Sequence, residues 1–263
     1  MERFVPELPE VEIMCRNLRR WLLGSSITID ILDSKWCKEG DIGLLQSKRV
    51  DRIFRRAKYI VLSIDSRYLV LHFRMTGKVV LDAPEKRKSA RIVFCGSDNK
   101  VLFIDRRRLG EGRVLDESGL QDLFVKLGPD AWPERKSEVW WKAAFGSLKG
   151  NVKPAILQQS RIAGIGNILA SEILFEARIS PFRSFLTLKD SEWTALADST
   201  PKVISAVIER DMADEIGFVQ DGAQNNFSLY GKKGEPCPRC KAPIQKTKQS
   251  GRFTYWCSLC QPK

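Results

Sequence analysis

The stretch from residue 236 to residue 260 reads PCPRCKAPIQKTKQSGRFTYWCSLC. It contains two Cys-x-x-Cys pairs, Cys237 with Cys240 and Cys257 with Cys260, separated by sixteen residues. A two-residue gap lets both thiolates of a tight turn reach one ion, and two such pairs suit one tetrahedral zinc ion. Two disulfides are the alternative, but these are typical of smaller, cysteine-dense chains from oxidising compartments. The pattern therefore predicts a structural zinc ion that pins a β-hairpin.

The segment between the two cysteine pairs is basic, and aromatic residues follow it. Its cationic side chains are Lys241, Lys246, Lys248 and Arg252. A hairpin held rigid by a metal can bring the guanidinium of Arg252 to a phosphate oxygen. We therefore interpret this segment as a phosphate-binding hairpin.

The chain as a whole is basic. Its 263 residues include 44 Lys and Arg against 32 Asp and Glu, which gives a formal net charge of +12. Such a charge favours a polyanionic partner, with nucleic acid ahead of a membrane surface. No apolar run approaches the ~20 residues of a membrane span, and the first residues lack the apolar core of a secretory signal. We therefore expect a cytosolic protein without a membrane partner, and the sequence gives no sign of an oligomer.

The chain ahead of the cysteine pairs divides into a strand-rich half and a helical half. A helix starts near Pro9 and stops at Gly24. Six strand-like runs follow between residues 27 and 104, at 27–32, 59–64, 68–73, 78–81, 91–94 and 101–104, which predicts an antiparallel sandwich or barrel. Helical periodicity then covers 139–145, 154–159, 168–177 and 188–210. We expect an α+β chain with a β-sandwich domain at 6–126, a helical domain at 127–229 that opens with a linker, and the zinc hairpin at 230–263.

Two further stretches carry candidate phosphate-binding groups. Lys58 follows two arginines ahead of an apolar strand run, and we interpret it as a cation that faces phosphate. Asn167 ends a Gly-Ile-Gly-Asn turn, where we expect it to cap the next helix and leave exposed amides for an anion. His72 is the one histidine of the chain, and its place in a strand predicts a structural, hydrogen-bonding role.

Motifs in these stretches resemble those of the formamidopyrimidine-DNA glycosylase and endonuclease VIII family. They are PELPEVE at 6–12, RRAKY at 55–59, NVKPAILQQSRIAGIGNILASEILFEARISP at 151–181, and YGKKGEPCPRC with GRFTYWCSLCQ at the end. The resemblance covers residues 6–261, in family order. It implies a helix-two-turn-helix domain in the middle of the chain. It also implies a bifunctional enzyme that excises oxidised purines from duplex DNA and then nicks the abasic site.

The resemblance also implies roles for individual residues. The secondary amine of Pro6 is the nucleophile that attacks the sugar C1′ and forms a Schiff base. Glu7 protonates the deoxyribose ring oxygen, and Glu10 assists by hydrogen bonding. The remaining roles are phosphate contact and help with elimination for Lys58 and Arg252, and a backbone-phosphate contact for Asn167. Met75 and Leu109 fill the gap left by the displaced nucleotide, and Arg107 reads the opposite base. Lys149 and Lys153 lie near the DNA or the base pocket.

Three departures from the family bear on the substrate. Leu109 stands where the family usually has phenylalanine, and Arg106 stands where a proline is common. The loop at 217–229 is shorter than the loop that caps 8-oxoguanine in typical members. Met75 and Arg107 favour oxidised purines, whereas the short loop favours an endonuclease VIII-like preference for oxidised pyrimidines.

The fourth departure concerns the nucleophile. Pro6 follows Met1–Val5 in the sequence, and a proline nitrogen in a peptide bond has no usable lone pair. Initiation at Val5 from a GTG codon, with removal of the initiator methionine, would expose Pro6, and so would proteolytic trimming. If Pro6 stays blocked, the alternative is a non-catalytic protein that binds damaged DNA.

Overall fold

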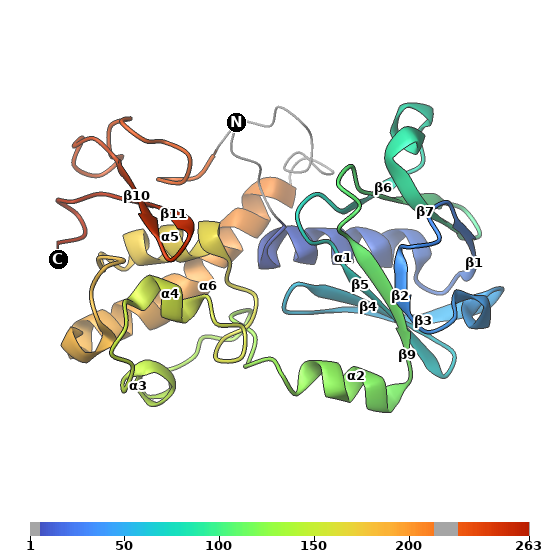
Figure 1. The fold of residues 1–263 in the computed structure, drawn as a ribbon, viewed down its shortest axis with the longest axis horizontal. Helices are drawn as coiled ribbons and strands as arrows, with labels where there is room; N and C mark the ends of the chain where they lie inside the picture. Colours follow the sequence, from blue (N-terminus) through green and yellow to red (C-terminus); the bar gives the residue numbers. More distant parts are fainter. Residues whose placement is uncertain (1–5, 213–225, 263) are drawn as a thin grey trace. The chain divides into compact units, whose positions relative to one another are not determined.

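The computed structural model describes residues 6–212 and 226–262. These residues form two compact units. The first unit holds residues 6–126 with 211–212, and the second holds residues 127–210 with 226–262. Figure 1 shows the helices and strands of both units.

The first unit begins with helix α1, Leu8–Leu22. Pro9 stands in its first turn, where the missing N–H costs no hydrogen bond. Val11, Met14 and Leu18 recur at helical spacing and are fully buried. The helix stops just before Gly24, whose φ of +79° is a left-handed conformation that glycine adopts without strain. The predicted helix and its stop signal are confirmed.

Nine strands of the first unit pair in the order β2-β9-β5-β4-β3-β1-β7-β8-β6. Neighbours are antiparallel except for β2 and β9, which are parallel. The first two residues of β1 pair with β3 and the next four pair with β7, so β1 joins two sheets. The bounds are β1 Ser26–Ile31, β2 Cys37–Glu39, β3 Lys48–Arg56, β4 Tyr59–Ile64, β5 Arg67–His72, β6 Lys78–Leu81, β7 Ala90–Cys95, β8 Lys100–Ile104 and β9 Glu111–Leu115.

One apolar core lies between the two sheets and α1. Ile60 of β4, Phe103 of β8 and Met14 of α1 all belong to it and are almost completely buried. Helix α2, Glu117–Phe124, covers the outer face of β4 and β5, where Leu120 packs with Val61. Short 3-10 turns lie at Ile42–Leu45 and Pro84–Ser89. The predicted β-sandwich is therefore present, with α1 against it.

The sequence did not predict β2, β3, β9 or α2. β3 reads KRVDRIFRR, and only Val50 and Ile53 of it are buried, so its charges hide the alternation of a half-buried strand. β9 reads EGRVL, in which Gly112 breaks the apolar run. A Cβ at Gly112 would lie 2.2 Å from the ring of Trp36, so close packing requires the glycine there.

The second unit is mainly helical and ends in a hairpin. Its elements are α3 Glu138–Phe145, α4 Val152–Ile156, α5 Asn167–Glu176, a 3-10 turn at Phe185–Thr187, α6 Asp190–Met212, β10 Gln245–Gln249 and β11 Arg252–Trp256. The last two residues of α6 belong to the first unit. Strand β11 packs on α5, as Figure 1 shows. All four predicted helices are present, with ends that differ by a few residues.

The segment expected as a linker is hydrogen-bonded into the second unit. The N–H of Gly128 donates to the carbonyl of Gln159 at 2.9 Å, and the N–H of Ala131 donates to the carbonyl of Ala163 at 3.0 Å. Of the loop expected at 217–229, residues 217–225 lie outside the described residues. Across residues 6–212 and 226–262, no helix combines the length and the apolar character needed to cross a bilayer.

Candidate functional site

The start of α1 carries three of the predicted site residues. Glu7 caps the helix, and Pro6 directly precedes it. The N–H of Glu7 donates to Oε2 of Glu10 at 2.8 Å, which is one half of a capping box. Both glutamates are only 4% exposed, while Pro6 is half-buried. Two buried carboxyl groups therefore share the turn that follows the predicted nucleophile.

The carboxyl group of Glu10 is difficult to ionise because it is buried. Burial raises the pKa of Glu10 to about 8, and the neighbouring Glu7 carboxylate contributes in the same direction. A buried carboxyl group beside another negative charge holds its proton more tightly. Near pH 7 Glu10 is mostly protonated.

Lys58 lies in the tight turn between β3 and β4. Ala57, just before it, has a φ of +54° and is almost fully buried. Arg55 Nη1 donates to the carbonyl of Ala57 at 3.1 Å, and Arg55 Nε donates to Glu12 of α1 at 2.9 Å. The other oxygen of Glu12 accepts from Arg16 Nε at 2.8 Å. This buried ion pair ties α1 to the turn that carries Lys58. The sequence analysis missed it, although Glu12 and Arg55 stand inside the PELPEVE and RRAKY motifs.

His72 faces Tyr59 across β5 and β4, with ring centroids 4.7 Å apart. Its Nδ1 accepts the N–H of Arg74 at 3.2 Å. Burial lowers the pKa of His72 to about 4, and the nearby charges of Arg74 and Lys58 lower it too. The ring is therefore neutral near pH 7 and accepts a hydrogen bond, as the structural interpretation of a lone strand histidine expects.

Met75, Arg107 and Leu109 lie on two loops of the first unit, one after β5 and one after β8. Arg107 Nη1 lies 3.1 Å from the sulfur of Met75, so the two loops are neighbours. Residues 106–109 are exposed, and Leu109 is 41% exposed, so this leucine is not a core residue. An exposed leucine and an arginine thus lie next to a methionine on one surface.

In the second unit Lys153 is not a surface cation. It is 1% exposed, and its ammonium group donates to Asn167 Oδ1 at 2.7 Å, Thr254 Oγ1 at 2.9 Å and the carbonyl of Phe253 at 3.1 Å. These three acceptors come from α5 and β11, while Lys153 itself comes from α4. Lys153 therefore locks the hairpin to two helices.

Asn167 does not cap α5. Gly166 is the cap residue, and Asn167 is the first helical residue. Its side-chain amide donates instead to the carbonyl of Phe253 at 3.0 Å and to the hydroxyl of Tyr230 at 3.3 Å. The expectation of a helix cap was wrong because the side chain turns toward the hairpin rather than toward the amides of its own helix.

The tip of the hairpin is a two-residue turn. Ser250 and Gly251 both have positive φ, +47° and +79°, which is typical of the type I′ turn that matches the twist of the strands. Arg252 follows directly and is exposed. A pocket of about 110 Å³ lies beside it, lined by residues of α4 and the hairpin that include Lys153 and Thr254. Lys149 is exposed ahead of α4.

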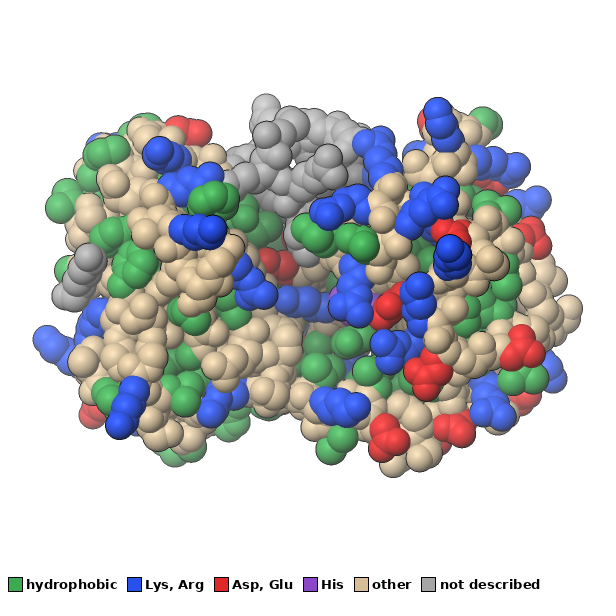
Figure 2. All heavy atoms as spheres, viewed as in Figure 1, with side chains coloured by type: hydrophobic (Ala, Val, Ile, Leu, Met, Phe, Trp, Pro, Cys, Tyr) green, Lys and Arg blue, Asp and Glu red, His purple; other side chains and the backbone are tan. Residues whose placement is uncertain are grey.

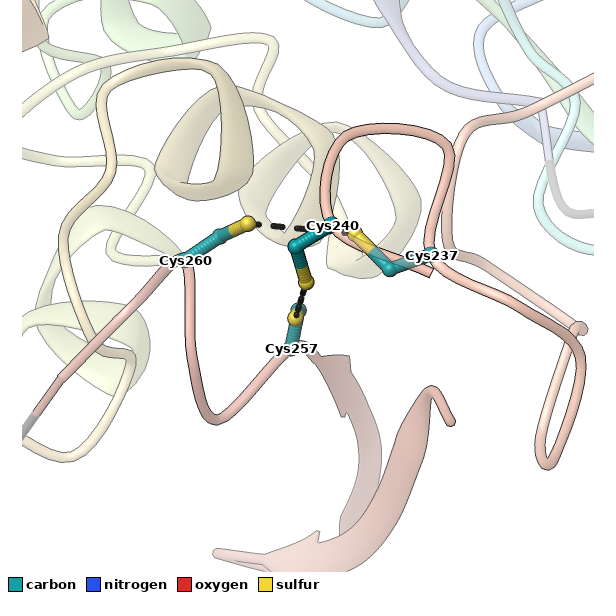
Figure 3. A group of neighbouring side chains, drawn as sticks. All are labelled: Cys237, Cys240, Cys257 and Cys260. Carbon is teal, nitrogen blue, oxygen red and sulfur yellow. Dashed lines mark hydrogen bonds between the residues drawn. The ribbon is translucent and has the colours of Figure 1, made fainter. Parts of the chain in front are cut away.

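The four cysteines of the C-terminal stretch gather around one point. Their sulfur atoms all lie within 4.8 Å of one another. The Cys240–Cys257 and Cys237–Cys260 sulfur pairs are 3.4 Å and 3.9 Å apart. A tetrahedral zinc ion with Zn–S bonds of about 2.3 Å needs sulfurs about 3.8 Å apart, whereas a disulfide needs about 2.05 Å. Figure 3 shows the sulfurs pointing toward one another from two loops, so the donor set fits one zinc ion.

Glu172 is a further buried residue that the sequence analysis missed. Its carboxylate accepts the backbone N–H groups of Ser228, Leu229 and Tyr230 at 2.8, 2.9 and 3.0 Å. It therefore fixes the chain as it enters the zinc hairpin. A glutamate within the apolar run of α5 was the available signal, because a charge in a buried helix requires partners.

Lys and Arg side chains are spread over the face of each unit that Figure 2 shows. Several of them form ion pairs, as Arg239 does with Glu176. Basic surfaces of this kind bind polyanions through phosphate contacts whose strength falls with salt.

Family models match three stretches of the chain. They describe the formamidopyrimidine-DNA glycosylase N-terminal domain at residues 5–112, its H2TH domain at 127–216, and the zinc finger found in FPG and IleRS at 234–263. The formamidopyrimidine-DNA glycosylase of Chloroflexus aurantiacus is 32% identical over 273 residues, which covers 98% of each chain.

Solved structures agree with these matches. Fpg of Lactococcus lactis in complex with abasic-site DNA superposes with a TM-score of 0.88 at 31% identity, over 98% of this chain and 100% of that one. The same enzyme bound to DNA with an oxidised pyrimidine gives 0.87 at 32% identity, with the same coverage. The four cysteines thus form the zinc finger of this family and hold one structural zinc ion. The chain belongs to the formamidopyrimidine-DNA glycosylase family.

Proposed function

We propose that this protein is a DNA glycosylase and abasic-site lyase of base excision repair that removes oxidised purines, 8-oxoguanine and formamidopyrimidines, from duplex DNA. The observation that carries the proposal is the placement of Pro6 directly before the buried Glu7–Glu10 pair at the start of α1. A secondary amine next to a buried acid is the pairing that imine-forming base excision requires.

In the first step the nitrogen of Pro6 forms a bond to C1′ of the damaged nucleotide. The glycosidic bond breaks, and the base leaves with its electron pair and takes up a proton from the solvent. The Glu7 carboxylate accepts the proton that the Pro6 nitrogen loses and passes it to the ring oxygen as the sugar opens, which leaves an iminium between Pro6 and C1′. An α-amine with a pKa of about 8 is partly neutral near pH 7, so Pro6 can attack without a buried base.

In the second step the iminium acidifies the C2′ proton. Loss of that proton expels the 3′ phosphate by β-elimination, and a further proton loss expels the 5′ phosphate by δ-elimination. Lys58 and Arg252 bind the phosphates and neutralise their charge as they leave. Glu10, mostly protonated near pH 7, accepts the backbone N–H of Glu7 and so holds the turn that carries Pro6 and Glu7.

The mechanism needs a free amine at Pro6, so we propose that the active chain begins at this residue. While Val5 is bonded to Pro6, the nitrogen is an amide and the chemistry stops. Initiation at Val5 with methionine removal, or trimming of the first five residues, would supply the free amine.

The second unit would hold the DNA backbone. Asn167 and Arg252 lie on the two elements that Lys153 joins, so helix and hairpin can present them to the backbone in a fixed geometry. The zinc ion is structural and holds this hairpin.

We place the protein in the bacterial cytoplasm at the nucleoid, where it acts as a monomer. We divide the chain into domains at residues 6–126, 127–229 and 230–263.

A second candidate is an endonuclease VIII-like preference for oxidised pyrimidines. The observation that favours it is the Lactococcus lactis relative in complex with DNA that contains an oxidised pyrimidine. If Pro6 remains blocked, a protein that binds damage without cutting is the third candidate.

Borohydride trapping tests the proposal. Chains that begin at Met1 and at Pro6 are mixed with an 8-oxoguanine duplex, an oxidised-pyrimidine duplex and an abasic-site duplex. We expect a covalent adduct only for the chain that begins at Pro6, with the 8-oxoguanine duplex ahead of the pyrimidine duplex. Glu7→Gln in the same chain should bind the duplex without excising the base. Binding by both chains without an adduct on any duplex would refute the enzyme and favour the damage-binding candidate.

A further inference from the structure

Asp105 is a buried acidic residue at the end of β8, and it precedes the exposed loop 106–109. It is only 1% exposed. Residues 106–109 are all exposed, and the following Gly110 is buried again. The exposed loop therefore begins and ends at buried anchors, and Asp105 is the charged one.

The carboxylate of Asp105 accepts from both ends of this loop. Oδ1 accepts the N–H of Arg107 at 3.1 Å, and Oδ2 accepts the N–H groups of Leu109 at 2.8 Å and Gly110 at 2.6 Å. A Cβ at Gly110 would lie 3.1 Å from Oδ2 and 2.8 Å from the ring of Phe103. Glycine at 110 thus allows the backbone to approach the carboxylate closely.

The same carboxylate reaches the second loop. Oδ1 also accepts the hydroxyl of Thr76, which directly follows Met75. The N–H of Arg107 lies 3.3 Å from that hydroxyl as well. Four donors from two loops therefore converge on one side chain, and each oxygen accepts two of them.

The backbone of Asp105 is fixed from the opposite side. The buried guanidinium of Arg91, on β7, donates to the carbonyl of Asp105 through Nε at 2.9 Å and Nη2 at 2.7 Å. The N–H of Asp105 donates to the carbonyl of Ser89 at 2.9 Å. Because these hydrogen bonds hold the backbone of Asp105, its carboxylate stays in place and fixes the positions of the two loops.

We infer that Asp105 is a positioning residue that holds Met75, Arg107 and Leu109 in one arrangement for insertion into the DNA helix. The inference rests on the proposed function, because insertion matters only to an enzyme that takes a nucleotide out of the stack. Asp105 would not touch DNA. It acts through the backbone of the two loops, so its loss should affect steps that need the intact duplex and spare the chemistry at Pro6.

Asp105→Asn tests this inference. Asparagine keeps the shape of the side chain but has an NH2 group in place of one oxygen. This group only donates, so it cannot accept the N–H donors that it would face. In the zinc-loaded chain that begins at Pro6, we expect excision from an 8-oxoguanine duplex to fall about tenfold or more, as an unmet buried donor implies. Preference between bases opposite the lesion should weaken with it. Cleavage of an abasic site in single-stranded DNA, where no opposite base is read and no stack is opened, should change less than about twofold.

Two further variants keep the test decisive. Asp98→Asn, in the exposed turn between β7 and β8, makes the same charge change and should leave all three readouts unaltered. Thr76→Val removes one donor to the carboxylate, keeps the side-chain shape, and should reproduce part of the duplex defect if Asp105→Asn fails to fold. A parallel loss on duplex and single-stranded substrates, or full duplex activity in both variants, would overturn the positioning role. If the unaltered chain cleaves neither substrate, the proposed function itself fails, and this inference falls with it.

Discussion

Glu10 offers a test of the charge state at the start of α1. Its pKa is about 8 in the folded protein, against 4.5 for an ordinary glutamate, chiefly because it is buried. Between these two values the folded state binds a proton that the unfolded state releases. The contribution of Glu10 to the free energy of unfolding is therefore fully present below about pH 4.5 and is lost as the pH rises toward 8. Between pH 4.5 and pH 7 the unfolded state loses this proton and the folded state keeps it. At 1.36 kcal/mol per pH unit, the free energy of unfolding is therefore about 3 kcal/mol lower at pH 7 than at pH 4.5.

Glu10→Gln removes the pH-dependent contribution of this carboxyl group to the free energy of unfolding. The amide is neutral at every pH, and its oxygen can still accept the N–H of Glu7. We expect the unfolding free energy of the variant to exceed that of the parent by an amount that grows by about 1.4 kcal/mol per pH unit between about pH 5 and pH 8. Urea unfolding at several pH values, followed through amide exchange of β4 and β5, measures this difference in the first unit.

Two controls accompany the experiment. Glu85→Gln, at an exposed site in the 3-10 turn Pro84–Ser89, should run parallel to the parent at every pH. In a carbon-13 NMR titration, one glutamate carboxyl resonance should shift with a midpoint near pH 8, and this resonance should be absent in Glu10→Gln. Parallel stability curves for parent and Glu10→Gln would mean that Glu10 is ionised in the folded protein near pH 7, which would refute a protonated Glu10 beside Pro6.

Three other predictions concern the second unit. Cys257→Ser should release the zinc ion and weaken duplex binding, whereas Cys95→Ser should retain both, as metal analysis and a binding titration will show. Lys153→Met should cost about 2–3 kcal/mol of stability because it leaves buried acceptors on the hairpin unpaired, while Lys149→Met at an exposed position should cost little in the same urea unfolding experiment. Duplex affinity should fall steeply with salt, and Arg252→Ala should reduce the slope of log affinity against log salt by about one, with an unchanged slope counting against its phosphate contact.

The sequence predicted the elements whose apolar residues follow a clear period. α1 and β4 are such elements, because burial of one face or of a whole strand leaves a readable pattern. β3 escaped because its exposed face is crowded with charge, although Ile53 anchors it in the core. A strand that is buried at only a few positions carries too weak an alternation to be read without its partners.

The site residues were predicted by another route. Pro6 and Glu7 were assigned through motifs that resemble a family, and no periodicity would have assigned them. Lys58 and Arg252 were first interpreted as phosphate-facing cations from their basic surroundings, and the resemblance added their role in elimination. The arrangement of their surroundings was not predictable in the same way. Lys153 was assigned near the DNA through the same resemblance, which did not predict that its ammonium group is enclosed by α5 and β11. Tertiary burial of this kind is not encoded in the spacing of a sequence.

The side chains of Asp105, Lys153 and Glu172 have a structural role in common that the sequence did not predict. Each is a buried charged side chain whose hydrogen bonds go largely to one neighbouring segment, and for Asp105 and Lys153 that segment carries predicted DNA contacts. Burying such a charge is costly unless it is well paired, so it persists only where several partners converge. Convergence fixes the segment in one geometry, since moving the loop would strand the charge. For a protein that must insert side chains into a duplex and grip its phosphates, this restricts the loops before DNA arrives and reduces the entropy lost on binding. Neutral replacements at these positions should therefore harm recognition of duplex DNA more than they harm the chemistry at Pro6.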